Sequence, residues 1–342
     1  MSTEPLPVTR KLFFREAVAK AVSEAMARDP KVLILGQDVG AFGGSYREFD
    51  GLWKAYGSDR VRDTPVAEAA TVGIAAGAAA AGYRPLVSIT YMDFLMLGFD
   101  PLINYAAKLK FKTQAKLSAP LVIKTTAGAQ GQGVAHSQCL ESWLMGVPGL
   151  KVVAPSTPAD AYGLMITALK QAGPVVYIDH KRLFPIPGEV PLEETPIAFG
   201  SAAIRREGTD FTLVTHGYMT QVALRAAQAL AEMGTNCEVV DLRSLSPLDM
   251  ETLLRSVQKT GKLLTLEEGQ TTCGVGVEVA GRIFEAMGPV PWVRLGARPM
   301  PVSSSPALES ATIPNVDDVL AAVQRLLAQP RGYCALAKER LP

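Results

Sequence analysis

Apolar runs of strand length, alternating with helical stretches, are the feature of this 342-residue sequence that most restricts its fold. Such runs are typical of parallel strands, which are buried on both faces and joined by helices. The predicted strands are 32–35, 85–90, 121–125, 150–154, 175–179, 211–215, 237–241, 263–267 and 292–295. The predicted helices are 12–28, 66–82, 100–112, 158–171, 220–233, 275–286 and 316–327. The pattern predicts an α/β fold of doubly wound sheets with helices on both faces.

Length and one proline-rich stretch predict two domains. The chain has about twice the usual length of a single domain. Residues 183–199, LFPIPGEVPLEETPIAF, contain four prolines and a glycine, and we expect no regular structure to persist through them. The predicted boundaries are 1–185 for the first domain, 186–200 for a linker, 201–330 for the second domain and 331–342 for a tail.

Charge and hydropathy argue against two classes of partner. The 34 Lys and Arg residues nearly balance 33 Asp and Glu, so the net charge of +1 provides no field to attract nucleic acid or an anionic membrane. Hydrophobic residues make up 48% of the chain, but no uninterrupted apolar run approaches the roughly 20 residues that cross a bilayer. We therefore expect no nucleic-acid or membrane binding, and assign the apolar excess to a core or to subunit interfaces.

Cysteine usage and the N-terminus indicate the compartment. The cysteines lie far apart without C-x-x-C spacing, which fits neither a zinc site nor a disulfide framework, so no metal site is predicted. They are Cys139, Cys237, Cys273 and Cys334. The first ten residues have neither an apolar signal core nor an Arg-rich amphipathic pattern. We expect a cytoplasmic protein, or one of the mitochondrial matrix if a transit peptide has been removed.

The glycine-rich turns do not complete a familiar motif. Gly131-x-Gly133 and Gly274-x-Gly276 both fall short of G-x-G-x-x-G, and the chain has no Walker A, H-E-x-x-H or G-x-S-x-G sequence. Simple nucleotide-binding, zinc-dependent and serine-hydrolase interpretations therefore lose their main support.

Three histidines occur, and their positions differ. His136 follows the polar, glycine-rich loop 128–133, a setting that suits a group exposed to a ligand at the end of a strand. A single loop histidine is nevertheless more often structural than catalytic. His180 ends a predicted strand beside two basic residues, where a structural role competes with phosphate or substrate binding. His216 ends the first strand of the second domain, where capping or packing is the default.

Glu68 is the only acid in the predicted helix 66–82, which otherwise consists mostly of Ala and Gly. An acid in the first turn complements the helix dipole and needs no further purpose. The functional alternative is a buried carboxyl with a raised pKa, because small neighbours allow another helix or subunit to approach closely. The sequence leaves both interpretations open.

Taken in order, several short motifs resemble the beta subunits of pyruvate, branched-chain 2-oxo acid and acetoin dehydrogenases. Each motif is weak alone, but their shared order from about residue 12 to residue 327 is specific. The motifs are DTPVAE at 63–68, YMDF at 91–94, AHSQ at 135–138, PGLKVV at 148–153, PSTPADA at 155–161, EVVDLRSLSPLD at 238–249 and SVQKTG at 256–261.

The resemblance implies a fold, a cofactor and partners. It implies a pyrimidine-binding, transketolase-like domain followed by a transketolase C-terminal domain. It also implies thiamine diphosphate shared with an alpha subunit, which holds Mg²⁺ and the diphosphate through a G-D-G...N-N motif that is absent here. The expected assembly is an α2β2 heterotetramer. It would act on a small 2-oxo acid or acetoin and pass the acyl group to a lipoyl-bearing dihydrolipoyl acyltransferase.

The same resemblance assigns four residues. Glu68 corresponds to the carboxyl that bonds the aminopyrimidine ring nitrogen and favours its imino tautomer. Phe94 corresponds to the aromatic side chain that packs on the pyrimidine, and Tyr91 of the same segment is assigned to cofactor binding. His136 corresponds to the active-site histidine that exchanges protons near the substrate carboxylate and the lipoyl group.

Four positions depart from the family's commoner pattern. Gln37 replaces an acid usually assigned to a polar route between paired active sites, and Leu97 replaces a polar residue of many pyruvate-type members. Gln171 and Gly173 stand where relatives surround a monovalent cation, which leaves a K⁺ site open. Two rivals remain, namely the C-terminal subunit of a split transketolase and a catalytically silent assembly subunit. The acyl substrate and the acyltransferase-docking residues are not assigned.

Overall fold

A computed structural model describes residues 8–330 of the chain, which divide into two compact units. The first unit holds residues 8–127 and 144–199, and the second holds residues 128–143 and 200–330. The second unit therefore includes a short segment that lies, by sequence, inside the predicted first domain.

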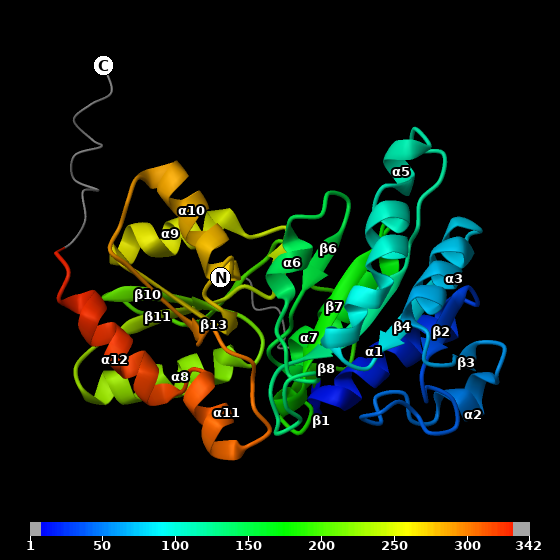
Figure 1. Cartoon of the computed structure of the whole chain (residues 1–342), viewed down its shortest axis with the longest axis horizontal. Coiled ribbons are helices and arrows are strands. Elements are labelled where there is room, and N and C mark those ends of the chain that lie inside the picture. Colours follow the sequence, from blue (N-terminus) through cyan, green and yellow to red (C-terminus); the bar gives the residue numbers. More distant parts are fainter. Residues whose placement is uncertain (1–7, 331–342) are drawn as a thin grey trace. The chain divides into compact units, whose positions relative to one another are not determined.

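The first unit is built on a parallel sheet (Figure 1). Its strands lie in the order β6 (Lys151–Val153), β7 (Val175–His180), β5 (Val122–Ala127), β4 (Arg84–Ile89), β2 (Val32–Gly36) and β3 (Val61–Asp63). Helices α1 (Phe14–Arg28) and α7 (Pro158–Lys170) pack together on one face. Helix α3 (Glu68–Ala80) and segment η2 (Asp100–Ala106) cover the other, as right-handed crossovers require. Apart from the edge strand β3, the strands are largely buried because both faces are covered.

The predicted linker is not free of regular structure. After a short turn, η3 (Lys181–Leu183), residues of the proline-rich stretch form β8 (Pro187–Pro191), which pairs antiparallel with β1 (Thr9–Phe13). The expectation that proline would prevent regular structure here was wrong. Pro187 and Pro191 stand at the two ends of a strand in a two-stranded ribbon, where proline is tolerated.

The predicted helix 100–112 is broken into shorter segments. It continues from α4 (Met92–Leu95) and η1 (Met96–Gly98) through the wider turns of η2 to α5 (Leu109–Lys112). Pro101 lacks the backbone N–H that a regular helix needs beyond its first turn. Gly98 packs so closely on α3 that a Cβ there would lie 2.8 Å from Val72 Cγ2.

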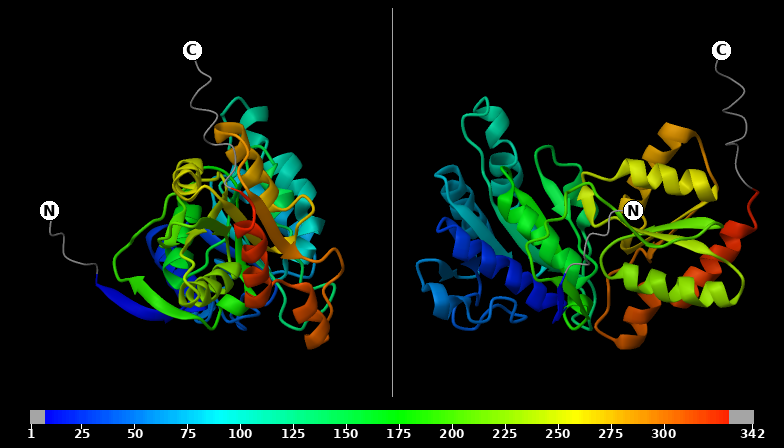
Figure 2. Two further views of the ribbon diagram at one scale, coloured as in Figure 1. Left: turned by 90° about the vertical axis from the view of Figure 1, so that its left-hand side faces the viewer. Right: turned by 180° about the vertical axis from the view of Figure 1, so that it is seen from behind.

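The second unit has its own sheet, in the order β14 (Trp292–Ala297), β13 (Leu263–Gln270), β10 (Phe211–Thr215), β11 (Cys237–Asp241) and β9 (Ala203–Arg206). All pairings are parallel except that of the edge strand β9 with β11. Helices α8 (Met219–Glu232) and α12 (Val316–Leu327) pack on one face, and α9 (Met250–Thr260) and α10 (Val275–Met287) on the other (Figures 1 and 2).

Helical spacing of apolar residues explains how α8 joins this core. Its buried side chains recur every three or four residues and meet the sheet and α12. The apolar ones are Met219, Val222, Ala223, Ala226, Ala227 and Leu230. Shorter elements complete the described chain, namely α2 (Leu52–Tyr56), α6 (Glu141–Met145), β12 (Ser244–Ser246) and α11 (Pro306–Thr312).

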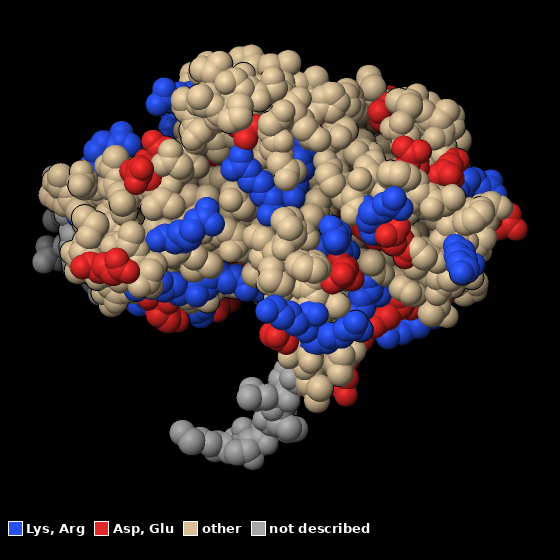
Figure 3. Space-filling model, turned by 90° about the horizontal axis from the view of Figure 1, so that it is seen from below, with Lys and Arg blue, Asp and Glu red and all other residues tan. Residues whose placement is uncertain are grey.

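The surface carries charges of both signs. Lys and Arg side chains lie beside Asp and Glu side chains over the face shown in Figure 3, in keeping with the net charge of +1. Between residues 8 and 330, no helix has the length and apolar character that would let it span a bilayer.

Candidate functional site

The topology of the first unit marks one place on its sheet. From β2 the chain passes to β3 on one side, whereas the adjacent β4 leads to β5 on the other side. Ligands of such sheets bind at the carboxyl ends of the strands where the connections diverge. The segments that follow β2, β3 and β4 are therefore the first candidates for a site.

Three predicted site residues lie on those segments. Glu68 is the first residue of α3 and is half-buried, and Tyr91 and Phe94 follow the end of β4. Their segments pack on each other, since a Cβ on Gly98 would lie 3.6 Å from the carbonyl oxygen of Glu68. The rings of Tyr91 and Phe94 meet edge to face with centroids 6.2 Å apart. The geometry is compatible with the roles predicted for these residues, which stay predictions.

Helix α3 forms because of its composition. Alanine is the strongest helix former, and seven of the 13 residues of α3 are Ala. Its buried residues recur at helical spacing and face the sheet and η2. They are Thr71, Val72, Ala75, Ala76 and Ala79. This packing fixes the first turn, and with it Glu68, beside the carboxyl ends of the strands.

A buried charge cluster, which the sequence analysis missed, lies in the same unit. Lys124 on β5 is 1% exposed, and its Nζ lies 2.7 Å from Asp179 Oδ2 and 3.0 Å from Glu48 Oε1. Burial alone would lower the pKa of Lys124, but the two carboxylates raise it above its ordinary value. Burial raises the pKa of Asp179 to about 6, against the opposing effect of Lys124.

This cluster anchors the loop that follows β2. Glu48 belongs to the loop of residues 37–50 and also accepts a hydrogen bond from Tyr46 N at 3.0 Å. Ser45 Oγ lies 3.2 Å from Thr90 Oγ1, directly before Tyr91. A lysine in the middle of the apolar run 121–125 was the signal that could have revealed the cluster, because a buried charge requires partners.

His136, the fourth predicted residue, lies in the second unit, on the segment of residues 128–143. It is half-buried, and its backbone N–H donates to Gly133 O at 3.2 Å in a turn. Two carboxylates bind the same segment. Glu268 Oε1 accepts from Ala129 N at 2.7 Å, and Glu309 Oε2 accepts from Gly131 N at 2.6 Å. His180 and His216 are both buried.

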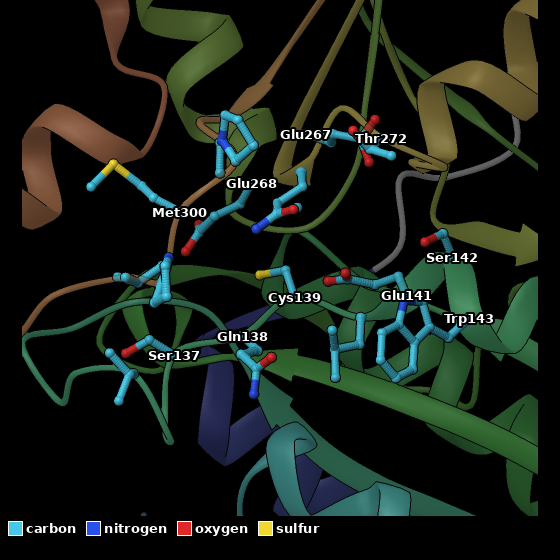
Figure 4. A pocket seen from close by; sticks show the side chains of 18 residues that line it. Ser137, Gln138, Cys139, Glu141, Ser142, Trp143, Glu267, Glu268, Thr272 and Met300 are labelled. Atoms are coloured by element: carbon cyan, nitrogen blue, oxygen red, sulfur yellow. The ribbon is translucent and has the colours of Figure 1, made fainter.

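The C-terminal part of this segment lines a cavity of about 430 Å³ within the second unit (Figure 4). Carboxylates of Glu141, Glu267 and Glu268 line it, together with the Cys139 thiol. In Figure 4 the carboxyl group of Glu141 extends toward Cys139. The other lining residues are Val134, Ser137, Gln138, Leu140, Ser142, Trp143, Gly269, Gln270, Thr272, Ala297, Pro299, Met300, Pro301 and Val302.

Two of these carboxyl groups hold protons near neutral pH. Burial raises the pKa of Glu141 to about 8, and the negative charges of Glu268 and Glu267 add to the effect. Burial raises the pKa of Glu267 to about 7, although two backbone N–H groups oppose the shift. The cavity therefore carries less negative charge at pH 7 than its three carboxyl groups would suggest.

Glu267 also explains the second glycine-rich turn. Its carboxylate accepts from Val275 N at 2.9 Å and from Gly276 N at 3.0 Å, and so caps α10. A Cβ on Gly274 would lie 2.4 Å from Glu267 Oε1, and one on Gly276 would lie 2.6 Å from Thr265 Oγ1. These glycines make room for an internal cap and do not form a nucleotide-binding loop.

Glu141→Gln is expected to stabilise the chain at alkaline pH. Between pH 4.5 and 8 the folded chain binds a proton at Glu141 that the unfolded chain releases, so the free energy of unfolding falls as pH rises. Removing this penalty should raise the free energy of unfolding by roughly 1–3 kcal/mol at pH 8, and the gain should shrink toward pH 5. Urea unfolding at both pH values measures it, with the exposed Glu285→Gln as the control. An equal effect of both substitutions, or a larger gain at pH 5, would contradict the assignment.

Comparison with protein families covers most of the chain. Residues 10–187 match the transketolase pyrimidine binding domain, and residues 200–319 match the transketolase C-terminal domain. The first match ends within the proline-rich stretch of residues 183–199, and the second begins directly after it.

Curated relatives are similar over nearly their whole length. The beta subunit of acetoin:2,6-dichlorophenolindophenol oxidoreductase from Cupriavidus necator is 39% identical over 334 residues, which cover 94% of this chain and 98% of the relative. The human mitochondrial pyruvate dehydrogenase E1 component subunit beta is 37% identical over 94% of this chain and 92% of its own. A solved structure described as a split gene transketolase, inactive beta4 tetramer, has a TM-score of 0.77 and 29% identity, and covers 92% of this chain and 98% of its own.

Proposed function

The chain belongs to the transketolase-like family of beta subunits of thiamine-diphosphate-dependent 2-oxo acid and acetoin dehydrogenases, and from this premise we propose that it is the beta subunit of a lipoamide-linked enzyme active only with an alpha subunit. The observation that carries the proposal is the placement of Glu68, Tyr91 and Phe94 on adjoining segments at the divergence point of the sheet. We propose domain boundaries of 1–185 and 201–330, with a linker at 186–200. We also propose that the protein is located in the cytoplasm or the mitochondrial matrix.

The residues of this chain fit the pyrimidine half of thiamine diphosphate. A half-buried carboxyl at the start of α3 suits a ring nitrogen, and the edge-to-face aromatic pair supplies an apolar surface for the ring. When bound, the cofactor supplies a carbon nucleophile and an electron sink. In the proposal, Glu68 holds a proton at the ring nitrogen and Phe94 packs on the ring, with Tyr91 beside it.

His136 has a separate task in the proposal. Its imidazole donates and accepts protons at the substrate, because histidine changes charge close to neutral pH. Mg²⁺ and the diphosphate are assigned to the alpha subunit, since this chain lacks a G-D-G sequence. The partners are that alpha subunit in an α2β2 assembly and a lipoyl-bearing acyltransferase.

A potassium site is not part of the proposal. The end of α7, where such a site was left open, presents the carbonyl oxygens of Leu169 and Gln171. Arg84 Nη1 donates to both, at 3.1 and 3.0 Å. A guanidinium on those oxygens disfavours a second cation, and neither Gln171 nor Gly173 offers a carboxylate.

Reconstitution tests the proposed function. The chain would be co-expressed with an alpha subunit that carries G-D-G...N-N and supplied with thiamine diphosphate and Mg²⁺. We expect decarboxylation of a 2-oxo acid, or cleavage of acetoin, with 2,6-dichlorophenolindophenol as electron acceptor, and none without the alpha subunit. Pyruvate, branched-chain 2-oxo acids and acetoin would be compared. Failure with all of them in an assembled α2β2 complex would refute the proposal.

One rival keeps a specific observation in its favour. The split gene transketolase shares the fold over 92% of this chain at 29% identity. A split transketolase would transfer a ketol group between sugar phosphates. The same reconstituted complex should show no ketol transfer if the proposed function holds. A catalytically silent assembly subunit would assemble but respond to no substitution at Glu68.

A further inference from the structure

Two buried carboxylates hold the backbone just ahead of His136. Glu268 lies on β13 and Glu309 lies on α11, and they are 8% and 6% exposed. Each accepts a hydrogen bond from the segment 128–143, Glu268 from Ala129 N at 2.7 Å and Glu309 from Gly131 N at 2.6 Å. Strand β13 and helix α11, which are both distant in sequence from this segment, thus anchor residues 129–131.

Two backbone hydrogen bonds and a glycine turn shape the segment that carries His136, of which residues 130–132, 134 and 135 are exposed. Gly128 N donates to Gln138 O at 3.5 Å, which closes the loop, and His136 N donates to Gly133 O at 3.2 Å. Gly133 has a φ of +76°, and a Cβ there would lie 3.3 Å from Ser304 Cβ. Any side chain at position 133 would therefore be strained and crowded. The two anchors fix one end of a loop whose turn sets the direction of His136.

The Glu268 anchor has the larger energetic effect because the group that it satisfies is buried, whereas Gly131, which binds Glu309, is exposed. Ala129 is 0% exposed, so its N–H has no access to water once the acceptor is removed. Hydrogen bonds to a charged acceptor are stronger than neutral ones, and leaving a buried N–H unsatisfied costs about 1–3 kcal/mol. Burying a carboxylate also costs desolvation free energy, and a neutral acceptor would cost less. The use of two carboxylates here therefore indicates that a strong acceptor is needed.

We propose that Glu268 and Glu309 are positioning residues that hold His136 in its catalytic orientation from within the second unit. The inference rests on the proposed function, in which His136 exchanges protons with the substrate. Productive catalytic geometry tolerates deviations of only about 0.5 Å, so the supporting shell of a catalytic group affects its rate. Neither carboxylate touches the substrate in this proposal.

A purely structural role predicts a different result. If the carboxylates only stabilise the second unit, their loss would lower the melting temperature and affect activity as any equally destabilising substitution does. Asp249→Ala provides that matched control, because Asp249 caps α9 and binds Ala202 N without contacting the segment 128–143. Loss of such a cap costs about 1 kcal/mol.

The experiment compares Glu268→Leu and Glu309→Leu with the rescue variants Glu268→Gln and Glu309→Gln, which keep an acceptor oxygen. Each is prepared as the complete alpha-beta assembly. Hydrogen exchange of residues 128–143 is measured by mass spectrometry, and kcat and KM are measured with the accepted substrate. Exchange in α1 and α7 serves as the internal reference, because those helices pack together in the first unit.

We expect the Leu variants to exchange about tenfold faster or more in residues 128–143, with unchanged exchange in α1 and α7. Their kcat should fall by about tenfold or more with little change in KM, because a small misplacement of a catalytic group is costly. The Gln variants should recover most of both quantities. Unchanged exchange in the segment, or a loss of kcat no greater than in Asp249→Ala, would overturn the proposal. If exchange responds but the wild-type assembly turns over no substrate, the anchoring stands and the proposed function fails.

Discussion

Replacing Glu68 by Gln in the assembled enzyme should lower kcat by about 10²- to 10⁴-fold, the range of a lost proton-transfer group. The glutamine is nearly isosteric but cannot hold a proton at the ring nitrogen. Assembly with the alpha subunit and the melting temperature should change little, because Glu68 is half-buried and lies at the start of α3. Turnover with the artificial electron acceptor is the measurement.

The matched control for this substitution is Glu251→Gln. Glu251 is also an acid in the first turn of a helix, α9, and it is exposed. Both substitutions remove a favourable interaction with a helix dipole, worth about 0.3–1 kcal/mol. If Glu68 serves only the dipole, both variants will keep full turnover, and the catalytic assignment will be wrong.

Lys124→Met should cause the largest loss of stability of the substitutions considered, about 3–5 kcal/mol. It leaves Glu48 and Asp179 as buried carboxylates without their cation. Urea unfolding of the isolated chain, followed by circular dichroism, measures the loss. The control Lys110→Met, at an exposed position, should have almost no effect on the free energy of unfolding. Lys124→Arg, which keeps the charge, should lose less stability than Lys124→Met.

The pH dependence of this loss has a definite sign. The pKa of Asp179 is already raised to about 6 by burial, and losing Lys124 raises it further. In the variant, the folded chain therefore binds a proton that the unfolded chain releases. Stability is retained at low pH and declines as pH rises, so the deficit should grow from pH 5 to pH 8. A deficit below 1 kcal/mol at pH 8, or one that shrinks with rising pH, would contradict the buried-cluster description.

The sequence predicted the long periodic elements well. Strands β10 and β11 and helix α12 have the predicted bounds, because their apolar residues follow one period and turn residues flank them. Other elements were not predicted. Helix α9 begins at an Asp249 N-cap, but much of its surface is charged or polar. Strand β9 has only half-buried residues and pairs antiparallel at an edge, so neither period nor hydrophobicity marked it.

The candidate site was predictable only in part, for a physical reason. The resemblance to a family assigned roles to Glu68, Phe94 and His136, because motif order carries that information, and these roles stay predictions. The supporting groups come from distant positions. Glu268 and Glu309 lie more than 130 residues from the loop that they hold, and a single sequence gives no sign of such pairing. Lys124 in its apolar run indicates a buried charge, but the sequence does not identify Glu48 as its partner across 76 residues.

The membership of residues 128–143 in the second unit has a consequence for recombination. A crossover placed at the proline-rich stretch would combine residues 128–143 of one parent with Glu268 and Glu309 of another. In such hybrids the loop and the carboxylates that bind it would come from different proteins and would not be matched, even where each half folds correctly. Successful exchange between relatives would have to transplant the loop along with the C-terminal half, as a discontinuous insert.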